Sequence, residues 1–367
     1  MTKTSKIIIA IIILILITGG IWYGLTRKAK EEEVIKIGVL TPLSGPAAFY
    51  GENIIKGIKI AKQVINDAGG INGVPIELVV EDSKCDGSIS LTAAIKLADM
   101  DRVTGIIGQA CSAATIPVGT IAQNKGFVLI ACAASNPKIT ESPNVFRVNP
   151  NDLAQSQSIA KYLKDSGISK VSILALNDEY GNGLVDEFQK RFSELGGTIQ
   201  KIELFGSSTT DFKTQITKLE TSEFEILFII ASPAQHPLIA KQLDELGKDW
   251  RKIAEFNFGV VPEDSKNEAM KGTLYPTVTF DETATENARI LKNLMEEKYA
   301  KEPDIVTAWG FDSLYVFAKA AGKCSEVNAD CIRENLVGLS FNGASGSNSF
   351  TEEGEVEQLP FKIIEYK

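Results

Sequence analysis

Short β-branched runs alternate with longer amphipathic segments along most of this chain, and this alternation constrains its fold more than any other feature. The run "VIKIGVL" (34–40) is followed by "NIIKGIKIAKQVINDAGG" (53–70). In the second segment, apolar residues recur at helical spacing, and Gly69 is well placed to end a helix in the left-handed conformation. Strands that alternate with helices predict βαβ units and therefore an α/β fold built on parallel sheets.

A weak internal repeat indicates that the chain contains two units of this kind. Residues 171–197 repeat the order found in residues 37–70: strand, polar loop, Tyr-Gly, helix, Gly-Gly. Residues 225–247 correspond in the same way to residues 104–126. A chain of 367 residues is also longer than one hydrophobic core conveniently serves. We therefore expect two similar α/β lobes that meet across a cleft at the carboxyl ends of their strands, where open α/β sheets bind ligands.

The stretch "GQACSAATIP" (108–117) follows the apolar run 104–107 and has no large side chain to fill a core. We expect Gly108 to Thr115 to form the loop between a strand and a helix on the cleft side of the first lobe. The small side chains of this loop leave its backbone amides free to approach a ligand closely.

The N-terminal segment contains nineteen consecutive residues without a charge, from Ile7 to Leu25. As a helix, this run spans roughly 28 Å, which is enough to cross a bilayer. Lys3 and Lys6 precede it, which favours a cytosolic N-terminus and an uncleaved signal anchor with its linker, residues 1–33. A cleaved secretory signal is the alternative. Under both interpretations, the body of the protein lies outside the cytosol.

The five cysteines would then lie in an oxidising compartment, where disulfides persist. Cys85 and Cys111 each follow a strand-like run, and neighbouring strand ends meet at one edge of a parallel sheet, so these two thiols are a candidate pair. Cys324 and Cys331 form a second, local candidate pair, which leaves Cys132 unpaired. Five free buried thiols are the alternative.

Composition and motifs argue against two large classes of function. The formal net charge is −9, and no basic stripe follows residue 30, which argues against a nucleic-acid partner. The sequence has no nucleophile elbow, phosphate loop or metal-spaced cluster, and its one histidine is His236, so we expect no catalytic residues, no metal and no cofactor. The segment "YGNGLVD" (180–186) has Asp186 where a dinucleotide-binding turn needs its third glycine, and we interpret it as the entry to a helix.

Two tyrosines occupy matching positions in the two repeats. Tyr50 and Tyr180 each end a polar loop. A loop tyrosine is usually a packed residue at the rim of a fold, but the paired placement favours a role in the wall of a ligand site. We therefore predict both as ligand-binding residues.

Five segments together form a pattern typical of one protein family. They are residues 35–82, "CDG" (85–87), "IIGQACSAAT" (106–115), "AASNPKIT" (133–140) and "NDEYGNGL" (177–184). With these segments the chain resembles the leucine/isoleucine/valine-binding solute receptors of ABC importers, over nearly all of residues 35–367. Members of that family have two Rossmann-like lobes, joined by three hinge strands, that close over one small ligand. The resemblance therefore implies a periplasmic binding protein type I fold.

The resemblance also implies roles for individual residues of the first half. It assigns Cys85 and Cys111 as the family's disulfide, which would clamp the loop between them. It assigns Ser112 as the serine that receives the ligand carboxylate together with backbone amides, in agreement with the affinity of exposed helix-terminal amides for anions. Tyr50 and Tyr180 correspond to walls around the ligand side chain.

The segment "CAASNP" supplies a further part of the implied site. By resemblance, Ala133 and Ser135 are the pair that contacts the ligand carboxylate and ammonium. We count Ala134, which lies between them, as a ligand-binding residue as well.

The second half of the chain departs from the family pattern. Where the family's amino-acid receptors place a tyrosine and then a glutamate against the ligand ammonium, this chain has Ser232 and Asn257. A shift of two residues in the alignment brings Glu255 to the ammonium instead. If Glu255 points to solvent, a buried ammonium faces neutral groups, which is costly. All three residues are therefore candidates, and the ligand class is left open.

Together, these features predict an extracytoplasmic receptor that captures a small carboxylate-bearing solute by hinge closure and delivers it to an ABC permease. A branched-chain or other aliphatic amino acid is the leading ligand; a keto acid, an amide and an aromatic acid are alternatives. A sensory ligand-binding protein of the same fold is a rival function, although only six residues precede the apolar run and no second span follows it. We expect a monomer with lobe 1 at 34–148 plus 279–349 and lobe 2 at 149–278 plus 350–367.

Overall fold

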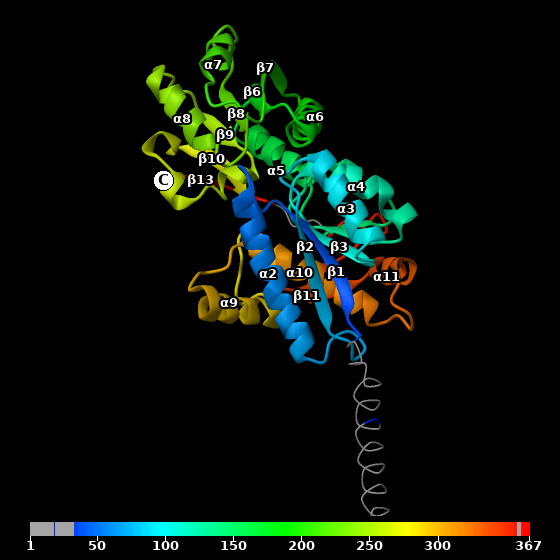
Figure 1. The fold of residues 1–367 in the computed structure, drawn as a ribbon. Helices are drawn as coiled ribbons and strands as arrows, with labels where there is room; N and C mark the ends of the chain where they lie inside the picture. The colour runs from blue at the N-terminus through cyan, green and yellow to red at the C-terminus, as the bar shows by residue number, and fades with distance from the viewer. Residues whose placement is uncertain (1–17, 19–32, 358–360) are drawn as a thin grey trace, which may run out of the picture. The chain divides into compact units, whose positions relative to one another are not determined.

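The computed structural model describes residue 18 and residues 33–357 and 361–367. Within this part of the chain, one sheet is formed by the first half of the sequence (Figure 1). Its strands are parallel and lie in the order β2 (Ile76–Asp82), β1 (Ile35–Thr41), β3 (Gly105–Gln109), β4 (Val128–Ala131) and β5 (Val145–Arg147). The carboxyl ends of these strands therefore meet at one edge, as the alternation of strands and helices predicts.

A second sheet is formed by the later part of the sequence. Its order is β13 (Lys362–Glu365), β10 (Thr273–Thr277), β9 (Lys252–Ala254), β8 (Ile226–Ile230), β6 (Lys170–Leu176) and β7 (Thr198–Phe205). The strands are parallel except for β13, which pairs antiparallel with β10. A short antiparallel hairpin, β11 (Ser340–Gly343) and β12 (Gly346–Ser349), stands apart from both sheets. The expected α/β fold with two sheets is confirmed.

Helices cover both faces of the first sheet. They are α2 (Ala48–Asp67), α3 (Gly87–Asp99), α4 (Ser112–Lys125), α9 (Glu286–Tyr299), α10 (Ile305–Ala321) and α11 (Ala329–Leu336), with the short 3-10 helix η1 (Pro137–Glu141). On β1, Val39 packs with α2 and α10, whereas its neighbour Leu40 packs on the opposite face with α3 and α4. Successive strand residues point to opposite faces, so a sheet covered on both sides needs the continuous apolar runs that the sequence contains.

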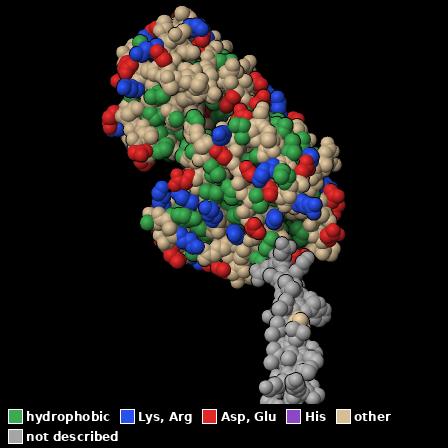
Figure 2. All heavy atoms as spheres, viewed as in Figure 1, with side chains coloured by type: hydrophobic (Ala, Val, Ile, Leu, Met, Phe, Trp, Pro, Cys, Tyr) green, Lys and Arg blue, Asp and Glu red, His purple; other side chains and the backbone are tan. Residues whose placement is uncertain are grey.

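The second sheet is built in the same way. Its helices are α5 (Asp152–Asp165), α6 (Glu179–Glu194), α7 (Lys213–Leu219) and α8 (His236–Glu245), and the 3-10 helices η2 (Phe256–Phe258), η3 (Glu263–Ser265) and η4 (Glu268–Met270) follow β9. On β6, Ile173 packs with α5 and α6, whereas Leu174 packs with α7 and α8. On the face drawn in Figure 2, Lys and Arg side chains are interspersed with Asp and Glu side chains.

The chain passes between the two sheets three times. It crosses from β5 to α5, returns from β10 to α9, and crosses again from β12 to β13. The third crossing includes residues 358–360, which lie outside the described part. The lobe boundaries given above stay predictions.

The N-terminal prediction falls mostly outside the described residues. Of the expected anchor and linker at 1–33, the structure describes only residues 18 and 33. Among the described residues, no helix combines the length and the apolar character needed to cross a membrane.

Several element boundaries differ from those expected. The helix expected from residue 53 already begins at Ala48, while Gly69 has the expected positive φ, at 102°. The loop expected from Gly108 to Thr115 is much shorter, because β3 continues to Gln109 and α4 begins at Ser112. Ala113 and Ala114 in the first turn of α4 are good helix formers, so the helix begins early instead of the loop continuing.

Two glycines allow α2 and α10 to pack closely. A Cβ atom at Gly57 of α2 would meet the backbone oxygen of Thr307, and one at Gly310 of α10 would meet the backbone oxygen of Ile54. Backbone atoms cannot rotate away as a flexible side chain can, so the two helices would have to separate. The absence of a side chain at both positions thus fixes the distance between the helices.

We predict that Gly57→Ala lowers the free energy of unfolding by about 2 kcal/mol, the usual range for overpacking, despite the better helix propensity of alanine. Gly206→Ala is the matched control, since a Cβ there finds no atom nearer than 3.7 Å. Urea denaturation followed by circular dichroism measures both changes. Equal midpoints for the two variants would contradict the close-packing argument.

Both candidate cysteine pairs are joined. Cys85 and Cys111, whose Cα atoms are 5.4 Å apart, connect the segment after β2 to the start of α4. Cys324 and Cys331, with Cα atoms 5.9 Å apart, connect the end of α10 to α11. Cys132 is a buried free thiol, and burial raises its pKa to about 12, so it stays protonated and unreactive.

We predict that a non-reducing peptide map recovers both disulfides and that Cys132 is alkylated only after unfolding. Closing the loop between Cys85 and Cys111 stabilises the fold by about 3 kcal/mol in the chain-entropy model, so Cys85→Ser with Cys111→Ser should unfold at clearly lower denaturant concentration. Alkylation of Cys85 and Cys111 in the folded, unreduced protein would contradict the first pairing.

Candidate ligand-binding site

A cavity of about 520 Å³ opens at the carboxyl ends of strands from both sheets. Its wall includes residues that follow β1, β3 and β4 on one side and residues that follow β6, β8 and β9 on the other. Seven of the predicted ligand-binding residues line it: Tyr50, Ser112, Ala133, Ser135, Tyr180, Ser232 and Asn257. Two others, Ala134 and Glu255, are not part of the wall. The two repeats thus bring matching segments together as the sequence predicts.

The N-terminus of α4 faces the cavity with free amide groups. Ser112 and Ala113 of its first turn line the wall. The N–H groups of Ala114 and Thr115 donate to the backbone oxygen of Cys111, whereas those of Ser112 and Ala113 come too early in the helix for such a partner. The side chain of Cys111 makes no cap. The positive end of the helix dipole lies at the same place. This part of the wall therefore suits an anionic group such as a carboxylate.

Ser112 is 2% exposed, and its hydrogen bonding leaves a donor available. Its Oγ accepts the backbone N–H of Asn136 at 3.2 Å. A hydroxyl that accepts one bond still carries its own proton. Ser112 can thus donate to a carboxylate placed at the start of α4.

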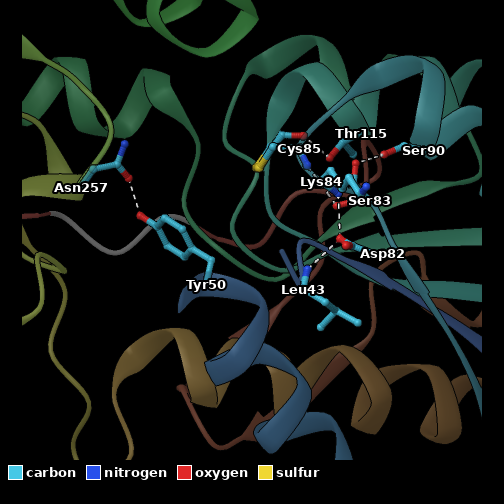
Figure 3. The surroundings of a disulfide bond; sticks show 10 residues. Leu43, Tyr50, Asp82, Ser83, Lys84, Cys85, Ser90, Thr115 and Asn257 are labelled. Carbon is cyan, nitrogen blue, oxygen red and sulfur yellow. Dashed lines mark hydrogen bonds between the residues drawn. A yellow bond between two sulfur atoms is a disulfide. The ribbon is translucent and has the colours of Figure 1, made fainter. Parts of the chain in front are cut away.

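A group of hydrogen bonds and the first disulfide hold the loops beside α4 (Figure 3). Asp82, at the end of β2, accepts the N–H of Leu43 at 2.8 Å, the hydroxyl of Ser44 at 2.6 Å and the N–H of Lys84 at 2.9 Å. Although burial raises the pKa of Asp82, these donors outweigh it and hold the pKa below its usual value. The ionised Asp82 therefore ties the segment after β1 to the segment that carries Cys85.

Tyr50 and Tyr180 lie in the first turns of α2 and α6, not in loops as expected. Tyr50 donates its hydroxyl proton to Oδ1 of Asn257 across the cavity, as Figure 3 shows, and Nδ2 of Asn257 donates to the backbone oxygen of Ala231 at 3.2 Å. Burial, with Glu255 as the next cause, raises the pKa of both tyrosines well above the usual value. Both hydroxyls therefore stay protonated and act as donors.

Glu255 takes neither of the two positions considered from the sequence: it does not reach the cavity wall, and it does not point to solvent. It is 0% exposed. Its Oε1 lies 2.8 Å from Nε2 of His236 and accepts the N–H of Ala231 at 3.2 Å. Its Oε2 accepts the hydroxyl of Tyr180 at 2.8 Å and the N–H of Asn257. With both oxygens occupied, Glu255 supports the wall behind Tyr180 and Asn257.

Ala134 also lies behind the wall. Its side chain is buried in the core between the first sheet and α3 and α4. Its backbone oxygen accepts Nη1 of Arg147 at 3.3 Å and Nδ2 of Asn149 at 3.2 Å. The backbone of Ala134 therefore holds the first crossing between the sheets, and its small side chain packs in the core.

Several residues of the wall were not predicted from the sequence. Trp309 comes from the interior of α10 and Phe256 from η2, and their rings lie 5.6 Å apart between centroids. Gln155 lines the wall from α5 and accepts the N–H of Phe256 at 2.6 Å. Apolar residues at helical spacing are normally interpreted as core residues. The sequence therefore offers no signal that separates Trp309 from its buried neighbours.

The arrangement is suited to binding a small molecule. Among residues 33–357 and 361–367, no group of three or more His, Cys, Asp and Glu side chains is placed to hold a metal ion. The cavity has the free amides of α4 beside Lys84 and Asp86 on one side, and Ser232, Asn257 and the carboxylate of Asp178 on the other side. Aromatic and apolar groups such as Tyr50 and Trp309 complete the wall. Such a site suits one small molecule with a carboxylate and an apolar body.

Comparison with known proteins identifies the family to which this chain belongs. The profile of the periplasmic binding proteins matches residues 34–366, and the chain belongs to this family. The relatives that it matches include proteins named leucine/isoleucine/valine-binding proteins, in agreement with the sequence resemblance.

Three similar proteins illustrate the relationship. A leucine-, isoleucine-, valine-, threonine- and alanine-binding protein of Pseudomonas aeruginosa is 26% identical and covers 94% of this chain and 92% of its own length. The structure of a leucine-binding protein from Thermotoga maritima is 27% identical, with a TM-score of 0.81 over 88% of this chain and 93% of that one. A branched-chain amino-acid transporter substrate-binding protein from Streptococcus pneumoniae, in complex with isoleucine, is 26% identical with a TM-score of 0.79 over 88% and 94%.

We predict that Glu255→Gln lowers the free energy of unfolding by about 3 kcal/mol, because an amide donor would face donors in a buried site. Glu194→Gln, a surface carboxylate paired with Arg191, is the control and should change stability by no more than about 0.5 kcal/mol. Chemical denaturation measures both. A silent Glu255→Gln would show that its carboxylate is not a structural support.

Proposed function

We propose that this protein is the extracytoplasmic solute-binding receptor of an ABC importer. The observation that carries the proposal is the cavity at the carboxyl ends of both sheets, with the uncapped N-terminus of α4 and Ser112 on one side and Tyr180 and Asn257 on the other. A site formed by two α/β units opens and closes as they move. We further propose that the protein is not an enzyme, since the polar groups of the wall act as donors and acceptors for binding.

The proposed ligand is a branched-chain or other aliphatic amino acid. Its carboxylate would bind the α4 amides, Ser112 and Ser135, and its apolar side chain would pack against Tyr50, Tyr180 and Trp309. The names of the relatives from P. aeruginosa and T. maritima support this ligand class. A keto acid, an amide or an aromatic acid is the alternative, because Ser232 and Asn257 are neutral.

Hinge closure is the proposed mechanism of capture. Contacts already join the two sides: Tyr50 bonds to Asn257, and Nδ2 of Asn136 donates to the backbone oxygen of Glu179 at 2.6 Å. We propose that the three crossings act as hinges, that these contacts belong to the closed form, and that a permease reads the closed form of a monomeric receptor. The alternative is a sensory protein that uses the same motion.

We propose that residues 1–33 anchor the receptor at the membrane, with a cleaved signal as the alternative. The nineteen uncharged residues from Ile7 to Leu25 support both. Intact mass measured on the protein isolated from membranes distinguishes them, because cleavage removes a mass of several kilodaltons.

Native mass spectrometry followed by calorimetry tests the proposed function. We expect the purified protein to carry, or to bind on addition, an aliphatic amino acid such as leucine, and to bind isopentylamine, which lacks the carboxylate, far more weakly. Equal affinity for leucine and isopentylamine would contradict a carboxylate site at α4.

We predict that Ser112→Ala weakens leucine binding by about 1 to 3 kcal/mol, because the carboxylate loses a donor and the N–H of Asn136 loses its acceptor. Ser208→Ala is the matched control, a serine of the same cavity wall on the opposite side. Calorimetry compares the two variants. A larger loss of affinity in Ser208→Ala than in Ser112→Ala would argue for the opposite orientation of the ligand.

A further inference from the structure

A second cavity, of about 640 Å³, lies beside the second crossing between the sheets. Its wall is formed by residues 259–260, which follow η2, by residues 277–282 of the crossing, and by residues 302–305, where α10 begins. Among the described residues, Phe256 is the one residue that lines both this cavity and the candidate ligand-binding site. Phe256 therefore forms the partition between the two spaces.

Contacts on the side of the ligand-binding site hold this partition in place. The ring of Phe256 lies 5.6 Å from the ring of Trp309 and 6.1 Å from that of Phe361, measured between centroids. Both neighbours line the ligand-binding site, and both separations are in the range of favourable ring contacts. The backbone N–H of Phe256 also donates to Oε1 of Gln155 at 2.6 Å. The ring is therefore a fixed end wall of the ligand-binding site.

The second cavity offers apolar surface on the other side of this wall. Four apolar residues line it besides Phe256: Val260, Val278, Phe280 and Ile305. The first three are half-buried side chains that pack against the same core as Phe256, and the fourth is 5% exposed. An apolar group that passed beyond the ring of Phe256 would therefore find apolar surface to bury.

The wall of the second cavity also carries four carboxylates, those of Asp281, Glu282, Glu302 and Asp304. Like charges repel, so a negatively charged group would be disfavoured in this space. The space behind Phe256 thus suits an apolar extension of a solute and not an acidic one.

The proposed binding mode directs the solute side chain toward this partition. The solute carboxylate lies at the start of α4, beside Ser112, and the apolar side chain packs against Trp309. Because Trp309 is in ring contact with Phe256, the far end of the side chain approaches the ring of Phe256. A longer side chain would overlap with that ring, and forcing extra atoms into a packed wall is costly.

We propose that Phe256 determines which solutes the receptor accepts, because its ring limits the length of the side chain that fits between Ser112 and the partition. The inference rests on the proposed function and deepens it: the solutes are amino acids with short aliphatic side chains, and large aromatic amino acids are excluded. Without the ring of Phe256, the ligand-binding site would continue into the second cavity and accept longer apolar side chains.

Calorimetry with leucine, tryptophan and glutamate tests the proposal on the wild type and on Phe256→Ala. The wild type should bind leucine at least ~10-fold more tightly than tryptophan. Phe256→Ala should bind tryptophan ~10-fold more tightly than the wild type does and leucine ~3-fold more weakly, because the shorter side chain loses an apolar contact. Neither protein should bind glutamate more tightly than leucine.

Phe224→Ala is the matched control. It removes a half-buried ring that contacts the ring of Trp250, 5.0 Å away between centroids, and that lines neither cavity. Its ratio of leucine to tryptophan affinity should stay within ~3-fold of the wild-type ratio. Phe256→Leu keeps more of the packing and should shift the ratio in the same direction as Phe256→Ala, by a smaller factor. An unchanged ratio in both Phe256 variants would overturn the proposal.

A measurement without solute separates this proposal from the proposed function. If the wild type binds none of these amino acids, the proposed solute class is wrong, and crystals of Phe256→Ala under xenon pressure still test the partition. Xenon enters dry apolar cavities, so it should occupy the place of the removed ring in the variant and be missing there in the wild type. A ring of Trp309 or Phe361 that moves into this place and keeps the two cavities separate would overturn the proposal.

Discussion

The free amides at the N-terminus of α4 are the constraint on which the rest of the site depends. A helix end needs partners for its first N–H groups. The backbone oxygen of Cys111 accepts those of Ala114 and Thr115, but its sulfur is held by Cys85 and does not cap those of Ser112 and Ala113. The disulfide and the bonds of Asp82 fix the loops beside this helix end, so the amides stay open to the cavity. The parallel sheet brings the ends of β1, β3 and β4 to the same edge, so the residues that follow these strands form the rest of this side of the cavity.

The opposite wall of the cavity is held in place by the buried carboxylate of Glu255, whose two oxygens both take part in hydrogen bonds. Glu255 receives donors from His236, Tyr180, Ala231 and Asn257, and this network orients the two residues that face the cavity. The carboxylate therefore stabilises the second wall and has no oxygen left for a ligand. The carboxylates that line the cavity wall itself are those of Asp86 and Asp178.

The sequence predicted the layout of the fold and seven residues of the cavity wall, because strand and helix periodicity and the internal repeat are local patterns. It placed Ser112, Ser135 and Tyr180 correctly at one cavity. It did not separate Asn257, which lines the wall, from Glu255 two residues earlier, because burial depends on the 3-10 turn that follows β9. It also gave no signal for Trp309 or Phe256, whose positions in the wall depend on how distant elements pack.

The central claim is that the start of α4 binds the solute carboxylate, and the amide signals of Ser112 and Ala113 report on it most directly. In nitrogen-15 NMR spectra recorded during titration with an aliphatic carboxylate, either leucine or its keto acid, both amide protons should move downfield as they form charge-assisted hydrogen bonds. Saturable binding that leaves the amide signals of Ser112 and Ala113 unmoved would contradict the account.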